Sequence, residues 1–451
     1  MSRPDFAAII LAAGSGTRMK SAIPKVMHPV AGRPMIAHLL AAVKPLMPAA
    51  TVAVIGPHME AVARLVDPAV SVVQDPPLGT GDAVRTGLEA LFGQLAPQGA
   101  IHDVLVLFGD TPLLTTDALS LLLEERRRSD AAIVVAALRP QDPGVYGRLI
   151  LGPDGALESI VEAADATLDE LAIGLVNGGI MAIAARHAAD LIAALDRNNA
   201  KSEFYLTDIV PAARLRNLDC RIVELPEEEL AGVNNRADLA AAEALIQQRL
   251  RAHAMAAGAT LVAPETVFLS ADTLLGRDVV VEPNVVFGPG VEVAEGARIR
   301  AFSHLEGAVV GAGAVVGPFA RLRPGAVLEN DVHVGNFVEI KEARLGAGAK
   351  ANHLSYLGDS TIGAGANIGA GTITCNYDGV NKWRTTIGER AFIGSNTALV
   401  APVEIGAGAI VAAGSVVTRD VPADALTVAR GQQIDKPGRA VEIRSRLGSR
   451  K

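Results

Sequence analysis

An aliphatic residue returns at every sixth position from Leu269 to Pro422, and a glycine or another small residue usually follows it. An α-helix repeats every 3.6 residues and a half-buried strand every two, so neither produces this spacing. A six-residue repeat is typical of a parallel β-helix, in which three short strands make one triangular coil and stacked aliphatic side chains fill its axis. The pattern therefore predicts a β-helix in the second half of the chain.

This repeat is not uniform. It slips by one residue after Val309, Arg344 and Thr361, and an insertion from Asp378 to Thr386 interrupts one coil. Interruptions of a solenoid map to loops on one face, which is often the binding face. We therefore expect a site near them.

Short apolar runs alternate with amphipathic stretches in residues 1–233. The alternation predicts a Rossmann-like α/β domain, with a mostly parallel sheet covered on both faces and ligands at the carboxyl ends of its strands. The predicted strands are Phe6–Leu11, Val52–Ile55, Val70–Val73, Val104–Phe108, Ala131–Leu138, Gly179–Ala184 and Arg221–Leu225, and the predicted helices are Pro34–Ala42, Asp82–Leu91, Asp117–Arg128, Ala185–Leu195 and Phe204–Leu215.

Residues 234–257 are rich in Ala, Leu, Glu, Gln and Arg, which lose little conformational freedom in a helix. They are expected to form one long α-helix that connects the domain of residues 1–233 to a left-handed β-helix domain of residues 258–451. The six-residue pattern ends at Pro422, and the polar, basic tail from Arg439 is expected to be disordered at its end.

Composition narrows the class of protein. The 451 residues exceed one ordinary core, and the net charge of −8 without a long basic block argues against a nucleic-acid partner. Cys220 and Cys375 match no metal or disulfide spacing, which favours a reducing cytoplasm, and no apolar run is long enough to cross a bilayer. We expect a cytoplasmic protein without a membrane span that acts on small molecules.

The first predicted strand runs directly into Leu11-Ala-Ala-Gly-Ser-Gly-Thr-Arg-Met, and Pro24-Lys25 follows. Gly14 and Gly16 let the backbone approach phosphates, while Arg18 and Lys25 add positive charge. Such a glycine pair alone is often only a tight turn. The cationic residues beside it favour a nucleoside triphosphate.

Two further segments fit the same ligand. Phe108-Gly109-Asp110 ends a predicted strand with a carboxylate that could hold Mg²⁺ against phosphate oxygens, although an aspartate also commonly starts a turn. Gln74 carries an amide that can pair with a base edge, and Gly79-Thr80-Gly81 leads into a predicted helix N-terminus that favours anions.

Polar residues occupy outward positions of the β-helix around the second and third slips. His353 stands among them, and an imidazole titrates near neutral pH, so it can accept a proton from an amine. A single histidine on such a face is usually only a surface residue, but Arg323 and Lys341 could bind a sugar phosphate, and Tyr356 and Asn376 offer hydrogen bonds to hydroxyls.

In this order the N-terminal motifs resemble those of the sugar-1-phosphate nucleotidyltransferases. With the β-helix behind them, nearly the whole chain is similar to the bifunctional N-acetylglucosamine-1-phosphate uridylyltransferase/glucosamine-1-phosphate acetyltransferases of bacterial cell-wall precursor synthesis. The resemblance implies acetyl transfer from acetyl-CoA followed by uridylyl transfer from UTP, with Mg²⁺, and a homotrimer in which neighbours share each acetyl-transfer cleft.

Site residues carry over where the motifs coincide. The resemblance assigns UTP and the sugar nucleotide to Leu11, Ala12, Ala13, Gly14, Arg18, Lys25, Gln74, Gly79, Thr80, Phe108, Gly109, Gly147, Glu162, Asn177 and Asn234, and Mg²⁺ to Asp110 and Asn234. It makes His353 the catalytic base, with glucosamine-1-phosphate at Arg323, Lys341, Tyr356 and Asn367 and acetyl-CoA at Ala370, Asn376, Tyr377, Ser395, Ala413 and Arg430.

A few positions depart from the family pattern. Pro77 replaces a glutamine, Phe108 a tyrosine, Ala163-Ala164 a His-Lys pair and Gly178 a threonine. These positions concern base and sugar contacts, so the phosphate and metal residues are unaffected.

Two other classes of protein fit parts of the chain. A nucleotidyltransferase whose β-helix only regulates or oligomerises would have no reason to combine His353, Lys341 and Asn376-Tyr377. A scaffold with a degenerate nucleotide fold is opposed by the intact Gly14, Arg18, Lys25 and Asp110.

Overall fold

The computed structural model describes residues 5–14, 16–96 and 99–448, and it divides into two compact units, Met1–Arg249 and Leu250–Lys451. Helix α9 (Arg236–Ala256) begins in the first unit and ends in the second. Among the described residues, no helix is long and apolar enough to cross a membrane.

A sheet forms the centre of the first unit, with strand order β11-β7-β10-β6-β1-β4-β5, and each strand predicted from the sequence is confirmed. All of these strands run parallel except β10, which is antiparallel to both neighbours. The bounds are β1 (Phe6–Ala12), β4 (Ala50–Ile55), β5 (Val70–Val73), β6 (Asp103–Phe108), β7 (Ile133–Leu138), β10 (Val176–Ala184) and β11 (Cys220–Glu224).

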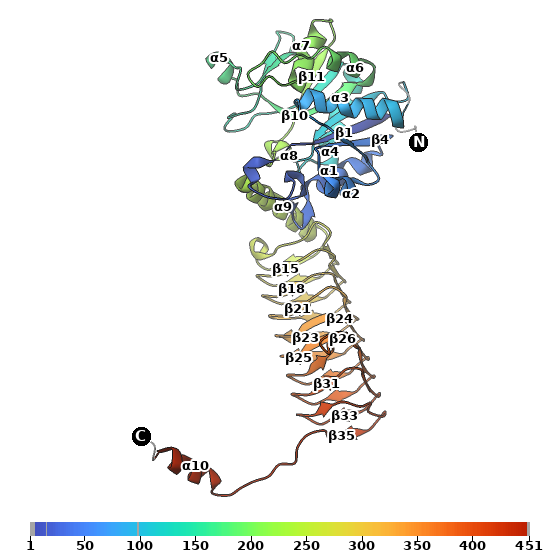
Figure 1. Ribbon diagram of the computed structural model, residues 1–451, viewed down its shortest axis with the longest axis vertical. Coiled ribbons are helices and arrows are strands. Elements are labelled where there is room, and N and C mark those ends of the chain that lie inside the picture. The colour runs from blue at the N-terminus through green and yellow to red at the C-terminus, as the bar shows by residue number, and fades with distance from the viewer. Residues whose placement is uncertain (1–4, 15, 97–98, 449–451) are drawn as a thin grey trace. The chain divides into compact units, whose positions relative to one another are not determined.

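Helices cover both faces of this sheet because its strands are apolar at successive positions (Figure 1). Ile9 and Val106 pack with α3 and α6, whereas the neighbouring Ile10 and Leu107 pack with α1 and α4. The helices are α1 (Met35–Val43), α2 (Glu60–Val66), α3 (Thr80–Ala90), α4 (Thr116–Ser129), α5 (Leu168–Leu171), α6 (Ala185–Ala193), α7 (Ile209–Arg214) and α8 (Glu227–Leu230). The helix predicted over Phe204–Leu215 starts instead as a 3₁₀ turn, Leu206–Asp208, ahead of α7.

A hairpin between β7 and β10 was not predicted. It consists of β8 (Arg148–Leu151) and β9 (Leu157–Val161), and β8 pairs with the start of β10. Its turn contains Pro153-Asp154-Gly155, and the amide of Gly155 donates to the carbonyl of Gly152 at 3.0 Å. Pro-Asp-Gly is a recognised turn signal, so the hairpin was readable from the sequence.

The second unit is a parallel β-helix, as predicted (Figure 1). One face is a ten-stranded sheet of β12 (Thr260–Leu261), β14 (Val280–Val281), β17 (Arg298–Ile299), β20 (Val315–Val316), β23 (His333–Asn336), β25 (Lys350–His353), β27 (Asn367–Ile368), β30 (Phe392–Ile393), β33 (Ile410–Val411) and β35 (Leu426–Thr427). The remaining faces are joined into a fourteen-stranded sheet because β24 (Glu339–Leu345) and β26 (Tyr356–Ile362) run through a corner. Its other strands are β13 (Leu274–Leu275), β15 (Val286–Phe287), β16 (Glu292–Val293), β18 (His304–Leu305), β19 (Ala308–Val310), β21 (Arg321–Leu322), β22 (Ala326–Leu328), β28 (Ile373–Cys375), β29 (Thr385–Ile387), β31 (Ala398–Val400), β32 (Val403–Ile405) and β34 (Val416–Val417).

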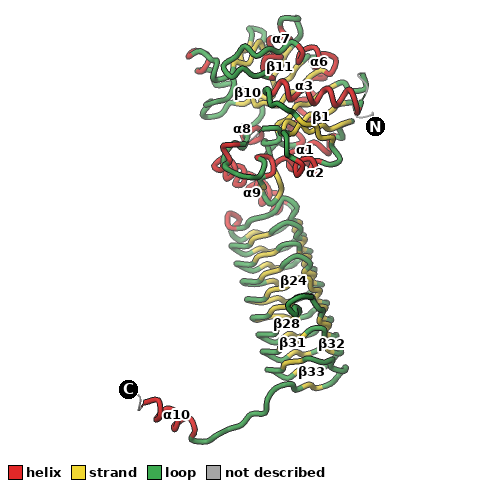
Figure 2. Tube along the Cα trace, viewed as in Figure 1, coloured by secondary structure: helices red, strands yellow, loops and turns green. Residues whose placement is uncertain are grey.

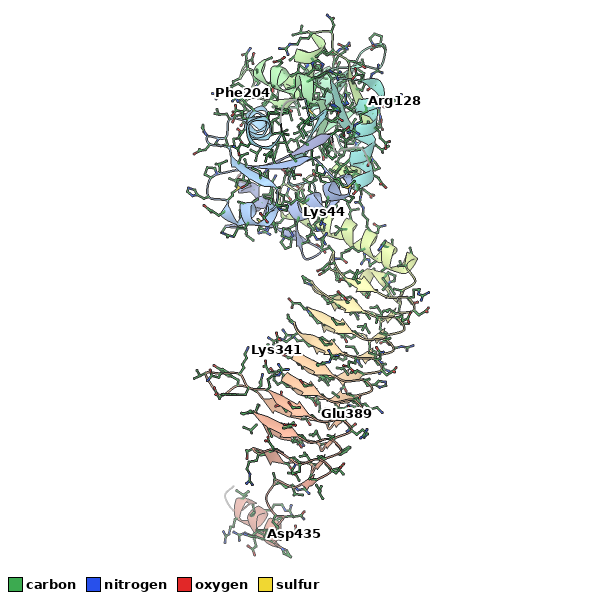
Figure 3. All side chains as sticks on the ribbon, turned by 90° about the vertical axis from the view of Figure 1, so that its right-hand side faces the viewer. Lys44, Arg128, Phe204, Lys341, Glu389 and Asp435 are labelled. Carbon is green, nitrogen blue, oxygen red and sulfur yellow. The ribbon has the colours of Figure 1, made fainter. Side chains whose placement is uncertain are left out.

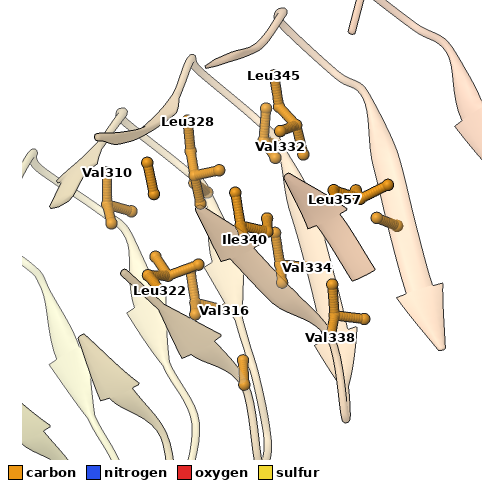
Figure 4. Close-up of a cluster of buried hydrophobic side chains, with 14 of the residues drawn as sticks. Val310, Val316, Leu322, Leu328, Val332, Val334, Val338, Ile340, Leu345 and Leu357 are labelled. Carbon is orange, nitrogen blue, oxygen red and sulfur yellow. The ribbon is translucent and has the colours of Figure 1, made fainter. Parts of the chain in front are cut away.

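Stacked aliphatic side chains fill the interior of the coils (Figure 4). Leu322, Ile340 and Leu357, one from each of three successive coils, are fully buried and aligned by the strand register. Each coil therefore buries its apolar side chains largely against the coils before and after it.

The predicted slips are confirmed by the register. Arg298, Val315, His333, Lys350 and Asn367 are successive partners that lie 17, 18, 17 and 17 residues apart, and the next partner, Phe392, follows after 25. The long interval contains the predicted insertion, which leaves the regular coils as a loop near β28 (Figure 2).

The C-terminal segment differs from the prediction in two ways. The repeat continues past Pro422 as β35, and the basic tail forms helix α10 (Arg439–Gly448). The sequence predicted a polar, basic tail here without assigning a helix to it, and Val441, Ile443 and Leu447 of α10 are exposed. Its expected disordered end, residues 449–451, lies outside the described residues.

Candidate functional sites

The loop after β1 folds back on itself at Gly16. This glycine has a φ of 59°, and a Cβ there would lie 2.7 Å from the Cβ of Lys25. Only glycine fits this turn, and because it has no side chain, Lys25 can approach the loop after β1. Helix α9 supports the loop from outside, since Arg236 Nε donates to the carbonyl of Met19 at 3.2 Å and Glu243 Oε2 accepts from the amide of Ala31 at 2.7 Å.

An open cleft of about 470 Å³ lies at the carboxyl ends of β1 and β6. This size suits a small ligand. The cleft brings together many of the residues predicted to bind UTP or the sugar nucleotide, namely Leu11, Ala12, Ala13, Gly14, Lys25, Gln74, Gly79, Thr80 and Phe108. It also includes the predicted metal ligand Asp110, together with Val26, Pro77, Ala83 and Glu203. Gly109 does not line it but joins the two strands, because its amide donates to the carbonyl of Leu11 at 2.9 Å.

The predicted cationic and metal-binding residues converge at one end of this cleft. Lys25 Nζ forms an ion pair with Asp110 Oδ2 and lies 3.5 Å from Asn234 Oδ1, which also accepts from Arg18 Nη2 at 2.9 Å. Side-chain oxygens of Asp110 and Asn234 thus already lie close to the positively charged nitrogen of Lys25. This arrangement fits a divalent cation that prefers oxygen ligands and keeps most of its coordination for phosphates and water.

Gln74 is buried, and its side-chain nitrogen donates to the carbonyl of Gly79 at 3.0 Å and to Asp82 Oδ2 at 2.7 Å. A carboxylate only accepts, so it fixes the amide with its nitrogen toward Asp82. No other described residue donates to the oxygen of Gln74, which therefore stays available as an acceptor. Asp82 was not identified from the sequence.

Glu162, a predicted sugar ligand, is connected to the nucleotide end through the segment around Phe204, which lies beside α3 (Figure 3). Phe204 exchanges backbone hydrogen bonds with the Gly79 turn, donating to Leu78 at 2.9 Å and accepting from Gly81 at 2.8 Å. Three residues further on, Thr207 Oγ1 donates to Glu162 Oε1 at 3.2 Å. Burial raises the pKa of the Glu162 carboxyl, against the opposing effect of this hydrogen bond.

The other predicted sugar ligands form a second connection. The amide of Asn177 donates to the carbonyl of Gly147 at 2.8 Å, and its side-chain oxygen accepts from the amide of Gly179 at 2.9 Å. A Cβ on Gly179 would lie 3.2 Å from the ring of Phe108, which lines the cleft. Gly147 and Asn177 are therefore adjacent, and a single glycine separates them from the nucleotide cleft.

Asp208 was missed by sequence reasoning. It follows Thr207, and burial together with the nearby carboxylates of Asp196, Glu162 and Asp165 raises its pKa to about 6. The surroundings of Glu162, a predicted sugar ligand, are therefore markedly acidic. The signal for this lies in long-range packing, because these carboxylates come from separate loops.

In the β-helix, Lys341, Tyr356 and Asn376 gather around Asp359, which was not predicted. Lys341 Nζ lies 3.8 Å from Asp359 Oδ2, and Asn376 Nδ2 donates to the same oxygen. Asn376 Nδ2 also lies 3.5 Å from the hydroxyl of Tyr356. Lys341 marks this side of the β-helix in Figure 3, where a loop projects beside it.

His353 ends β25 and is exposed. Its Nδ1 lies 3.1 Å from Oδ1 of Asn336, its register partner on β23. Because an amide oxygen only accepts, the proton of a neutral imidazole is placed on Nδ1, and Nε2 is left as the basic nitrogen.

The predicted phosphate ligand Arg323 makes a hydrogen bond through its Nη1 with Glu339 Oε1 at 2.8 Å, and Glu339 is the register partner of Tyr356. Arg323 therefore belongs to the neighbourhood of Lys341 and Tyr356. Asn367 does not join them in the described contacts, because it lies on the ten-stranded face, in register with Lys350 and Phe392.

The predicted acetyl-CoA residues follow one edge of successive coils. The carbonyl of Ala370 accepts from the amide of Asn396 at 2.7 Å, that of Ser395 accepts from Gly414 at 2.8 Å, and that of Ala413 accepts from Arg430 Nη1 at 2.6 Å. These contacts connect successive coils, in the direction from His353 toward the C-terminus. Tyr377 stands apart at the base of the insertion, where its hydroxyl donates to the carbonyl of Gly379 at 2.6 Å.

The insertion is a compact turn built on Asp378. Trp383 Nε1 donates to Asp378 Oδ2 at 2.7 Å, and the amides of Asn381 and Val380 donate to Oδ1 at 2.6 and 2.8 Å. These hydrogen bonds, that of Trp383 first, lower the pKa of Asp378 to about 2. The loop therefore keeps its anchor ionised at physiological pH.

Comparison with known proteins first defines the class. Residues 8–206 match the MobA-like NTP transferase domain, and residues 384–419 match the bacterial transferase hexapeptide family in its six-repeat form. The chain is thus a transferase that joins an NTP-transferase fold to a left-handed, hexapeptide-repeat β-helix. It belongs to the GlmU family of bifunctional proteins.

This membership rests on similarity over both units. The chain is 54% identical over 452 residues to the bifunctional protein GlmU of Paramagnetospirillum magneticum, with 100% of this chain and 99% of the relative covered. It is 58% identical over 442 residues to the GlmU of Rhodospirillum rubrum, with 98% of each chain covered, and 56% identical over 443 residues to that of Acidiphilium cryptum, with 98% and 99% covered.

Proposed function

We propose that this chain catalyses two consecutive steps of UDP-N-acetylglucosamine synthesis. The β-helix transfers an acetyl group from acetyl-CoA to glucosamine-1-phosphate, and the first unit then transfers a uridylyl group from UTP to N-acetylglucosamine-1-phosphate. The observation that carries this proposal is that one chain contains both a cleft ending in the ion pair of Lys25 with Asp110 and an exposed imidazole, His353, oriented by Asn336.

Uridylyl transfer needs no protein nucleophile. A phosphate oxygen of the sugar phosphate attacks the α-phosphorus of UTP, the bond to the bridging oxygen breaks, and pyrophosphate leaves. In this proposal Arg18 and Lys25 neutralise the developing negative charge, and Gly14 lets the phosphates approach the backbone. Asp110 and Asn234 would hold Mg²⁺, which neutralises phosphate charge when bound.

Recognition of the two ends of the ligand follows from the same contacts. The free oxygen of Gln74 is suited to accept a hydrogen bond from the imide N–H of uracil, because its nitrogen is occupied by Asp82. Glu162, Asn177 and Gly147 supply the sugar end. We infer that the Phe204 segment, which contacts both ends, sets the distance between them.

Acetyl transfer begins with removal of a proton from the sugar ammonium group by Nε2 of His353. The free amine then attacks the thioester carbonyl to form a carbon–nitrogen bond, the carbon–sulfur bond breaks, and the coenzyme A thiolate leaves with the proton that the attacking nitrogen loses as it becomes an amide. Arg323 and Lys341 are placed for the sugar phosphate and Tyr356 for a hydroxyl. Asn376 offers a donor to the developing oxyanion.

The assembly is proposed to be a homotrimer that shares its acetyl-transfer sites. Phe302, Phe319 and Phe337 stack on successive coils with ring centroids 4.9 and 5.3 Å apart, although their exposed fractions are 54%, 46% and 57%. An exposed aromatic ladder next to the coil of His353 supports a protein interface.

Light scattering should give three times the 46.6 kDa chain mass, and Phe319→Lys should lower the measured mass. A monomeric wild type would contradict the trimer.

Two substitutions test the division of labour. Asp110→Ala should lower UTP-dependent pyrophosphate release by about 100-fold or more and leave acetyl transfer unchanged, because it removes a proposed metal ligand. His353→Ala should lower acetyl transfer by about 100-fold to 10,000-fold and leave pyrophosphate release unchanged.

Matched controls come from the same units. Asp117→Ala on α4 and His333→Ala on β23 replace exposed residues of the same type outside the sites and should change neither activity. Purified protein is assayed with UTP, acetyl-CoA and the sugar phosphate, each omitted in turn. Full acetyl transfer by His353→Ala would show that the base is wrongly assigned, and joint loss of both activities in either variant would refute independent sites.

A further inference from the structure

One corner of the β-helix changes residue type next to the proposed acetyl-transfer site. Gly307 and Gly325 occupy this corner with φ of 52° and 81°, but the next two coils place Glu342 and Asp359 there with φ of 47° and 46°. The left-handed conformation costs an L-residue roughly 1–2 kcal/mol, and aspartate is among the side chains that tolerate it best. An acidic side chain is therefore retained where the fold favours glycine.

The side chain of Asp359 faces the proposed ligands. Its exposed fraction is 14%, and that of its ion-pair partner Lys341 is 18%. Asn376 Nδ2 donates to the same carboxylate oxygen that faces Lys341. Of the residues around this cluster, Asp359 is the one that contacts both the proposed phosphate ligand and the proposed oxyanion donor.

The backbone before Asp359 is fixed as well. The amide of Gly358 donates to Thr374 Oγ1 at 2.8 Å, and the same hydroxyl donates to the carbonyl of Gly358 at 3.0 Å. A Cβ on Gly358 would lie 2.4 Å from the hydroxyl of Tyr356, so the absent side chain makes room for the phenol. Asp359 is thus a fixed point to which Asn376 is attached.

We propose that Asp359 is a positioning residue for acetyl transfer, because its carboxylate fixes the carboxamide of Asn376. This inference rests on the proposed function. A carboxylate accepts but does not donate, so only the nitrogen of Asn376 can face it, and the opposite amide orientation would place two oxygens in contact. Of the two N–H groups of Asn376, one donates to Asp359, and the other points to the hydroxyl of Tyr356 at 3.5 Å, so the donor proposed for the oxyanion is the N–H that faces this hydroxyl.

Two substitutions separate this role from a structural one. Asp359→Gly removes the carboxylate but suits the positive φ, as Gly307 and Gly325 do in earlier coils, so the fold should keep its thermal stability. Asp359→Asn keeps an oxygen that can accept from Asn376 and removes only the charge. We expect kcat for acetyl transfer to fall about 10-fold to 100-fold in Asp359→Gly and less than about threefold in Asp359→Asn.

The Michaelis constant provides an independent readout. The Asp359 carboxylate repels the phosphate that Lys341 attracts, so the KM for glucosamine-1-phosphate should not rise in either variant. Asp359→Gly should also add little further loss to Asn376→Ala, because two residues that act through one contact are not additive. Asp331→Gly, at an exposed corner with φ of 57°, is the matched control and should leave both activities unchanged.

The outcomes distinguish this proposal from the proposed function. If the wild type does not acetylate glucosamine-1-phosphate, the proposed function fails. If the wild type acetylates it and Asp359→Gly keeps the wild-type kcat, the positioning role alone is overturned. Equal losses in Asp359→Asn and Asp359→Gly would also overturn it, since charge rather than the hydrogen bond would then matter, and UTP-dependent pyrophosphate release reports the integrity of every variant.

Discussion

The two units build their candidate sites in opposite ways. In the first unit, the contact between Arg18 and Asn234 joins residues 216 positions apart, because loops from distant parts of the chain meet at the carboxyl edge of a parallel sheet. In the β-helix, Tyr356 and Asn376 are 20 positions apart, and Lys341 and Asp359 lie on adjacent coils. The first site therefore depends on the whole sheet, whereas the second depends on a few neighbouring coils.

The two sites also differ in their exposure to solvent. The first is a cleft whose walls come from one unit, with Lys25 and Asp110 only 14% and 19% exposed. In the second site Lys341 and Asp359 are similarly buried, with 18% and 14% exposed, and His353 is the exposed member. An exposed base cannot exclude water from a thioester by itself, which supports the proposed sharing of this site between copies of the chain.

The largest expected effect concerns the cleft of the first unit. Lys25→Met should lower kcat/KM for uridylyl transfer by about 1,000-fold, because it removes the cation that pairs with Asp110 and faces the phosphates. Steady-state pyrophosphate release measures the loss, and acetyl transfer should not change. A loss below about tenfold would mean that this lysine does not contact the reacting phosphates.

A smaller effect tests the local construction of the β-helix. Ile340→Ala should lower the free energy of unfolding of the second unit by about 2–4 kcal/mol, because Ile340 is fully buried between coils. Val309→Ala, at an outward position with 43% exposure, should cost less than about 0.5 kcal/mol. Calorimetry of Ile340→Ala, with both activities followed on heating, should show that acetyl transfer is lost before uridylyl transfer. Simultaneous loss of the two activities would contradict the independence of the units.

Orientation of the exposed base should have a still smaller effect. Asn336→Ala should lower kcat for acetyl transfer by about tenfold, because the imidazole loses the acceptor that fixes its tautomer. Asn330→Ala, whose side-chain oxygen accepts from the amide of Ala312 at 3.1 Å away from His353, serves as control. An unchanged rate in Asn336→Ala would show that substrate binding alone orients the histidine.

The smallest effect concerns the carboxylates around Asp208, which lie outside the lining of the cleft. Because the folded-state pKa of Asp208 is raised to about 6, ionisation of this group destabilises the native state as the pH rises from about 4 to about 6. Asp208→Asn should therefore be more stable than the wild type at pH 7, by of the order of 1 kcal/mol after allowance for its partial exposure. Thermal unfolding at pH 4 and pH 7 measures this, and the gain should vanish at pH 4.

The fold was largely predictable because its two signals are strong. The six-residue period and the alternation of apolar runs with amphipathic stretches depend on local sequence, and the register confirmed the slips in coils 298–315, 333–350 and 350–367. The β8–β9 hairpin and α10 were not predicted. Both are short and give a weak periodic signal, and the hairpin is marked in the sequence by its Pro-Asp-Gly turn rather than by periodicity.

The candidate sites were predictable only as far as motifs reach. Gly14, Lys25 and Asp110 belong to recognisable strand-end motifs, and the cleft brings them together. Asp82, Thr207 and Asp359 carry no motif of their own, since an acidic or hydroxyl residue in a loop has many ordinary uses. Their importance follows from packing against Gln74, Glu162 and Asn376, which local sequence does not encode.

Helix α9 supports the loop after β1, and these contacts bear on how much of the chain the first unit needs. Asn234, Arg236 and Glu243 hold Arg18, Met19 and Ala31 from a segment that composition alone assigns to a linker. A shortened protein that stops at Val233 would keep every strand of the sheet. It would lose the hydrogen bonds that Asn234, Arg236 and Glu243 make with the loop after β1 and with Ala31. The connecting helix is thus part of the structure that supports the candidate nucleotide site, and we expect a minimal version of the first unit to extend at least through Glu243.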